Sequence, residues 1–140
     1  MADIELRRHG EKQRATIPDL VIGTLPHVVI NRCLGLELEA GNVVLTRGAQ
    51  RHAAKRHPKE YAMCLPQIAS VVVRPLYVGD DFKNSGKIEL IGRIRAASIS
   101  ILVAVNVRRD EHGNYHIESF YPVSDEKINN RRRKGFLRVV

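Results

Sequence analysis

The chain has 140 residues, of which 44% are apolar, 27% charged and 5% aromatic, and its formal net charge is +8. This length fits one hydrophobic core, and the aliphatic content excludes a chain that is disordered throughout. No apolar run approaches the roughly 18 residues of a membrane-spanning helix, and residues 1–14 lack the apolar core of a signal peptide. We therefore expect a soluble, cytoplasmic protein with no membrane partner.

Residues 1–15 mix acidic and basic side chains without a sustained period, which predicts a flexible charged arm ahead of a single domain at 16–140. Short aliphatic runs broken by glycine and proline follow as far as residue 45. They predict irregular structure or short strands, with one helix between Pro26 and Leu34.

Two helices are predicted next, with a break between them. Thr46 is a favourable N-cap for a helix over 47–56, because its hydroxyl can accept a hydrogen bond from an unpaired amide of the first turn. Pro58 disfavours helical geometry at His57 and suits the first position of a second helix, which we expect to stop near Pro66.

The apolar pattern then becomes strand-like, with β-branched runs and alternation between turns. The predicted strands are Val71–Val78, Lys87–Ile94, Ile99–Val107 and Tyr115–Val123. Short connections make neighbouring strands antiparallel. Ser124 is a plausible N-cap for a last, basic helix from Asp125 to about Lys134. The predicted architecture is α+β, with N-terminal helices packed on a four-stranded antiparallel meander and a basic C-terminal helix.

The positive charge is concentrated in two segments that contain no acid. Residues 47–59 and 131–138 together carry ten of the 23 basic residues, whereas the rest of the chain has 13 basic and 15 acidic residues. Two such segments favour an anionic ligand, most commonly a phosphodiester backbone, over an ordinary solvated helix face. The side chains that we expect to bind nucleic acid are Arg51, Arg56, Lys87, Arg93, Arg131, Arg132, Arg133 and Lys134.

His52 and His57 lie in the densest basic segment. An imidazole can give or take a proton near neutral pH, and cleavage of an RNA phosphodiester needs both a base and an acid. Five positions on one helix are about 140° apart, so both histidines can face one cleft only if the helix breaks at Pro58. The alternative is an exposed helix face on which both histidines are incidental. Neither the histidines nor the cysteines have metal-ligand spacing, so we expect no metal site and no cofactor.

The strand Tyr115–Val123 supplies the second set of candidates. Strict alternation places Ile117, Ser119 and Tyr121 on one face, and the two hydroxyls can hydrogen-bond a phosphate or a 2′-hydroxyl. The alternative is a strand with an ordinary amphipathic aromatic residue at its edge.

The order of motifs resembles a known pattern. The segments that carry it are Leu45-Thr46 before a helix with His52, Arg56-His57-Pro58, Arg74-Pro75-Leu76-Tyr77-Val78-Gly79-Asp80, Lys87-Ile88-Glu89-Leu90-Ile91, Ile101-Leu102-Val103-Ala104-Val105 and Ser119-Phe120-Tyr121-Pro122-Val123. From about Val43 to Phe136, the chain resembles the phage-associated barnase, EndoU, colicin and RelE-like nucleases, which share the BECR fold.

The resemblance implies a metal-independent endoribonuclease that cleaves RNA by 2′-hydroxyl attack and is a possible phage-derived toxin. Its catalytic residues would be His52, His57, Ser119 and Tyr121, with Lys55 and Lys87 as looser matches. The implied partners are RNA and, as for toxin members, an antitoxin or immunity protein. Two alternatives from the residues themselves are a non-catalytic nucleic-acid-binding module and a phage assembly protein.

Overall fold

The computed structural model describes residues 18–80 and 86–140. The strands are β1 Leu20–Thr24, β2 Asn42–Leu45, β3 Tyr77–Asp80, β4 Lys87–Ile94, β5 Ile99–Asn106, β6 Tyr115–Val123 and β7 Leu137–Val139. The α-helices are α2 His27–Leu34, α3 Arg47–Arg56, α4 Pro58–Cys64, α5 Ile68–Val73 and α6 Asp125–Arg133, with short 3₁₀ turns η1 Leu65–Gln67 and η2 Arg95–Ala97. The predicted arm at 1–15 lies outside the described residues.

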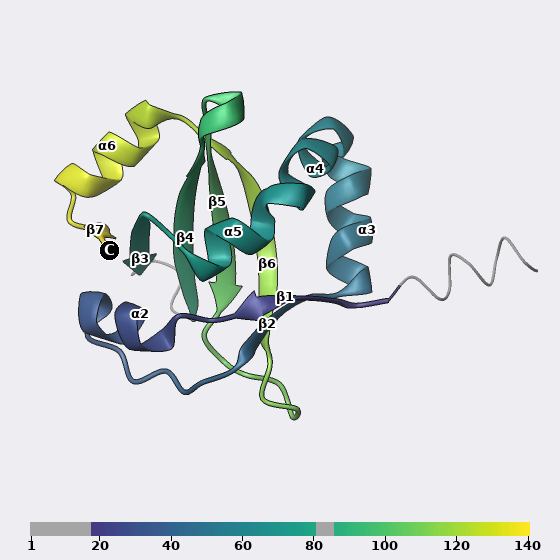
Figure 1. The fold of residues 1–140 in the computed structure, drawn as a ribbon, viewed down its shortest axis with the longest axis horizontal. Helices are drawn as coiled ribbons and strands as arrows, with labels where there is room; N and C mark the ends of the chain where they lie inside the picture. The colour runs from purple at the N-terminus through teal and green to yellow at the C-terminus, as the bar shows by residue number, and fades with distance from the viewer. Residues whose placement is uncertain (1–17, 81–85) are drawn as a thin grey trace, which may run out of the picture.

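The described strands form one mixed sheet in the order β1-β2-β6-β5-β4-β3-β7 (Figure 1). β3, β4, β5 and β6 pair antiparallel in chain order, whereas β2 pairs parallel with β6. The α+β class is therefore confirmed, and the short strands and the helix predicted before residue 45 are present as β1, β2 and α2. Our expectation that the sheet has four strands, with helices alone in front of them, was wrong. The sheet also contains β1, β2 and β7, and the first described element is a strand.

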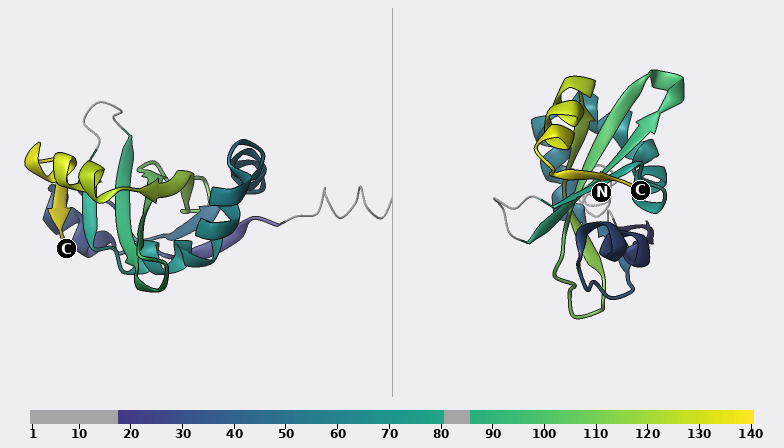
Figure 2. Two further views of the ribbon diagram at one scale, coloured as in Figure 1. Left: turned by 90° about the horizontal axis from the view of Figure 1, so that it is seen from above. Right: turned by 90° about the vertical axis from the view of Figure 1, so that its left-hand side faces the viewer.

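Two apolar cores lie on opposite faces of the sheet. The larger core contains Ile68 and Val72 of α5 with Ile88, Val103 and Phe120 of the sheet. The smaller core forms where Ile128 of α6 packs with Ile91, Leu102 and Leu137. Figure 2 shows α5 and α6 on opposite sides of the sheet. Because α6 is short, it covers only part of its face.

The prediction of a strand over Val71–Val78 was wrong. Residues 68–73 form α5, and β3 begins only at Tyr77. Val71 and Val72 are buried in the larger core, and a Cβ on Gly92 of β4 would lie 2.9 Å from Val71 Cγ2. Close packing of this helix on β4 therefore outweighs the strand preference of a β-branched run.

Candidate functional site

One stripe of α3 faces β6. Thr46 caps the helix as predicted, because its Oγ1 accepts a hydrogen bond from the Ala49 amide at 3.2 Å. From this start, Ala49, His52, Ala53 and Arg56 recur at helical spacing and line one cleft. The small alanines let the helix approach β6, and the longer His52 and Arg56 side chains line the same side.

His57 lies at the break between α3 and α4. Its amide donates to the Ala53 carbonyl at 2.9 Å and ends α3, while its carbonyl accepts from the Tyr61 amide at 2.8 Å and begins α4. The backbone at His57 is not helical (φ −139°, ψ 67°), and Pro58 is the first residue of α4. The helix therefore breaks where the sequence predicts it, and His57 lines the same cleft as His52.

A β-bulge in β6 determines which side chains reach the cleft. β5 pairs Ala104 with Ser119 but Val105 with Ile117, so Glu118 is an extra residue on β6. Strict alternation was therefore the wrong pattern here. Ile117 packs in the larger core, whereas Ser119 and Tyr121 pair opposite residues of the smaller core and share its face of the sheet.

The cleft lies beside the edge of β6. β2 pairs with β6 only at Tyr115 and His116, and α3 and α4 contact the strand beyond that point. The volume of the cleft is about 430 Å³. Its polar lining residues are His52, Arg56, His57, Glu60, Glu118, Ser119, Tyr121 and Lys127. The structure thus brings together both helical histidines, one arginine and both strand hydroxyls, which come from segments about 60 residues apart in the sequence.

Three carboxylates lie in or behind this cleft and pair with cations or with imidazole. Glu60 Oε2 lies 3.7 Å from His57 Nδ1, an exposed contact that is longer than a hydrogen bond. Glu118 Oε2 lies 3.3 Å from Lys87 Nζ. Glu89, on β4, is paired with Arg131 of α6.

The Tyr121 phenol is half-buried, and its pKa is raised. Burial is the largest cause and the Glu89 carboxylate adds to it, whereas the cations of Arg131 and Lys87 oppose the shift. The hydroxyl is therefore protonated at neutral pH. It can donate one hydrogen bond to an anionic oxygen in the cleft.

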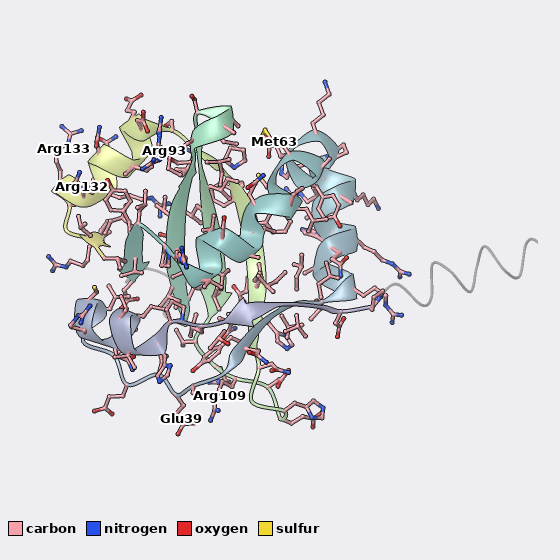
Figure 3. All side chains as sticks on the ribbon, viewed as in Figure 1. Glu39, Met63, Arg93, Arg109, Arg132 and Arg133 are labelled. Atoms are coloured by element: carbon pink, nitrogen blue, oxygen red, sulfur yellow. The ribbon has the colours of Figure 1, made fainter. Side chains whose placement is uncertain are left out.

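The remaining predicted residues lie outside the cleft. Arg51 and Lys55 belong to α3 but lie outside the row of residues, Ala49, His52, Ala53 and Arg56, that lines the cleft. Lys87, Arg93, Arg131, Arg132, Arg133 and Lys134 belong to β4 or to α6 and the residue after it. Figure 3 shows Arg132 and Arg133 on α6, on the opposite side of the molecule from α3. The two basic segments of the sequence therefore do not form one continuous site.

Sequence reasoning missed four features of the site: Glu60, Glu118, Lys127 and the pairing of Glu89 with Arg131. Only Glu89 had a usable signal, since an acid among aliphatic residues in a predicted buried strand requires a partner. The bulge that exposes Glu118 depends on pairing with β5 and has no local signature.

Within residues 18–80 and 86–140, no group of three or more histidine, cysteine, aspartate or glutamate side chains is arranged to hold a metal ion. In the same ranges, no helix combines the length and apolar content needed to cross a bilayer.

The chain matches the family model of phage-Barnase-EndoU-ColicinE5/D-RelE like nuclease 3 over residues 20–130, which is more than half of its length. The chain therefore belongs to this family of phage-associated nucleases. The resemblance inferred from the order of motifs is confirmed, and the match also extends to β1 and α2, which the motif comparison did not include. No curated protein and no solved structure shows a significant match to the chain.

Proposed function

We propose that the protein is a metal-independent endoribonuclease whose active site is the cleft between α3, α4 and β6. The observation that carries the proposal is the convergence of His52 and His57 with Arg56, Ser119 and Tyr121 on one cleft. Two imidazoles, a fixed cation and two hydroxyls are the groups that cleavage of an RNA phosphodiester requires. Membership of a nuclease family supports the same reading.

In the proposed reaction, one imidazole removes the proton of a 2′-hydroxyl and the 2′-oxygen attacks the adjacent phosphorus. The bond from phosphorus to the 5′-oxygen breaks, and the second imidazole, which is protonated, gives its proton to that oxygen. The products are a 2′,3′-cyclic phosphate and a 5′-hydroxyl. His52 and His57 are the pair, and the Glu60 carboxylate, 3.7 Å from His57 Nδ1, favours the protonated form of that imidazole.

The other cleft residues act on the phosphate. Negative charge grows on the non-bridging oxygens as the 2′-oxygen attacks, so fixed donors there lower the barrier. Arg56 and Lys127 supply positive charge, while the Ser119 and Tyr121 hydroxyls supply hydrogen bonds. Lys55, which lies outside the cleft, has no part in this mechanism.

The test uses purified protein and a labelled RNA oligonucleotide in excess EDTA. We expect cleavage with a cyclic phosphate end, and no cleavage of DNA of the same sequence because it lacks the attacking hydroxyl. His52→Ala and His57→Ala should each reduce the rate about 10²-fold or more. His112→Ala is the matched control, since this exposed histidine lies in the β5–β6 connection and should cleave at the wild-type rate.

Other outcomes exclude the mechanism. A requirement for a divalent ion would overturn it, and so would wild-type activity in both histidine variants. Binding of RNA without cleavage would instead identify a nucleic-acid-binding module. The toxin role and an antitoxin or immunity partner are part of the same proposal, and they predict growth inhibition on expression that His52→Ala relieves.

A further inference from the structure

Glu89 is the only side chain of a charged residue type that is buried within residues 18–80 and 86–140; the other buried polar residues there are Gln50 and Ser100. It lies near the middle of β4, opposite Ala104 of β5. Removing a carboxylate from water is costly, and apolar side chains of similar size generally stabilise such a position as well or better. The position of Glu89 therefore calls for an explanation beyond packing.

The partner of this carboxylate comes from a different element. Arg131, in the last turn of α6, donates from Nη1 to Glu89 Oε1. Glu89 holds the guanidinium against the sheet face that α6 leaves partly open. Of the four consecutive basic residues at the end of α6, Arg131 is the one turned towards the sheet, whereas the next three are exposed.

Tyr121 connects this pair to the cleft. Tyr121 shares the sheet face of the pair: it pairs with Leu102 of β5, which pairs with Ile91, two residues from Glu89 on β4. Consistent with this placement, the Glu89 carboxylate raises the pKa of the phenol, whereas the Arg131 guanidinium lowers it by charge and by a side-chain hydrogen bond. Tyr121 therefore lines the cleft and also packs on the sheet face that carries the ion pair. Glu89 and Arg131 do not themselves line the cleft.

We infer that Glu89 and Arg131 are positioning residues, which hold the Tyr121 hydroxyl towards the phosphate of an RNA substrate in the cleft. Arg131 occupies the acceptor side of the phenol oxygen, so the phenol proton points away from the guanidinium and towards the substrate. Glu89 fixes the guanidinium in that place. This inference rests on the proposed function, since it assigns a role within the same cleft.

The experiment is a double-mutant cycle on the single-turnover rate of RNA cleavage in EDTA. The single variants are Tyr121→Phe, Glu89→Gln and Arg131→Lys, and the last two are each combined with Tyr121→Phe. Lysine keeps the charge of Arg131 but not its planar fork of donors, and glutamine keeps the shape of Glu89. Arg109→Lys is the matched control, because Arg109 pairs with Glu39 at a distant connection (Figure 3).

We expect Tyr121→Phe to slow cleavage by about 10²-fold, as for loss of one preorganised donor to the transition state. Glu89→Gln and Arg131→Lys should each slow it by about tenfold through misplacement of the hydroxyl. In the Tyr121→Phe background, both changes should then have less than a twofold effect, and Arg109→Lys should cleave as wild type does. Full, independent effects in that background would overturn the inference, and so would wild-type rates in both single variants.

A second measurement does not depend on cleavage. The Tyr121 phenol can be followed by ultraviolet absorbance as pH rises, with Tyr121→Phe assigning its contribution among the four tyrosines. We expect Tyr121 to ionise at higher pH than an exposed tyrosine, and at lower pH in Glu89→Gln than in the wild type. If the wild type does not cleave RNA but this coupling is found, the proposed function fails and the geometry holds. Absence of coupling in a protein that cleaves RNA refutes the inference alone.

Discussion

The two basic segments of this chain look alike in sequence but serve different purposes in the structure. On α3, Arg56 and the neighbouring histidines line an open cleft. On α6, Arg131 pairs with Glu89, Arg132 lies 5.3 Å from the centre of the Tyr77 ring, and Arg133 donates a hydrogen bond to the Asn130 side chain. Positive charge that is already used within the fold contributes less to ligand binding. The position of a basic run in the fold, rather than its charge alone, therefore decides whether it lines a cleft.

The largest expected difference between the α3 and α6 segments is in the free energy of unfolding. Glu89→Ala leaves the Arg131 guanidinium without its carboxylate on a mostly buried face, which should cost about 3 kcal/mol in the free energy of unfolding. Urea denaturation of the purified variant measures this loss. Glu60→Ala removes an exposed carboxylate beside His57 and should cost less than about 0.5 kcal/mol. Equal losses would contradict the distinction between the two regions.

The second-largest expected effect is on the rate of RNA cleavage. Arg56→Ala should lower kcat/KM for RNA cleavage by about tenfold, because a cation at the transferring phosphate is lost. Arg133→Ala should lower it by less than about threefold, through long-range charge alone, and this smaller effect should vanish at high salt. Arg32→Ala, which changes an exposed residue of α2, is the control for general loss of charge. A larger loss of kcat/KM in Arg133→Ala than in Arg56→Ala would indicate that RNA binds at α6 instead of at the cleft.

A smaller effect is expected from the helix break. Pro58→Ala permits α3 to continue through His57, and each further helical residue turns by about 100°, which would carry the imidazole out of the cleft. We expect cleavage to slow severalfold while the melting temperature changes by only a few degrees. Pro66→Ala, at the 3₁₀ turn after α4, should leave the rate unchanged. Unaltered cleavage by Pro58→Ala would show that tertiary packing alone maintains the break.

The smallest effect involves an acid that is not buried. Asp110, between β5 and β6, accepts hydrogen bonds from the amides of Asn114 and His112 and contacts His116 at 2.7 Å. The Asn114 amide and then His116 lower its pKa to about 2. A lowered carboxyl pKa stabilises the fold above the unfolded pKa of about 4, and this stability is lost as pH falls towards 2. Asp110→Asn should therefore flatten the acid dependence of stability between pH 4 and 2 in thermal melts.

Features set by neighbouring residues were predictable from the sequence. The strand Tyr115–Val123 agrees with the structure because its apolar and aromatic residues follow a clear turn signal. The Thr46 cap, the break at Pro58 and the Ser124 cap rest on contacts within a few positions and agree with the structure as well. Their boundaries follow from hydrogen bonds that one short segment satisfies by itself.

Features that depend on distant partners were not predictable. α5 is a helix because β4 packs against it, and β7 forms because Gly135, with φ 79°, returns the chain to pair with β3. The bulge at Glu118 likewise needs β5 as its template. The site residues divide in the same way, into those with local sequence signals and those that depend on distant partners. The histidines and hydroxyls could be found from their types and spacing, whereas Glu60 and Lys127 join the cleft only through the tertiary arrangement.

The additional residue at Glu118 has one more consequence for β6. It shifts the alternation, so that Ile117 and Phe120 hold the strand to the helices while Ser119 and Tyr121 face elsewhere. Stability and chemistry are thereby assigned to different positions of a single strand. Ser119, which is exposed, can therefore change without repacking the interior, whereas a change at Tyr121 also alters the packing of the smaller core.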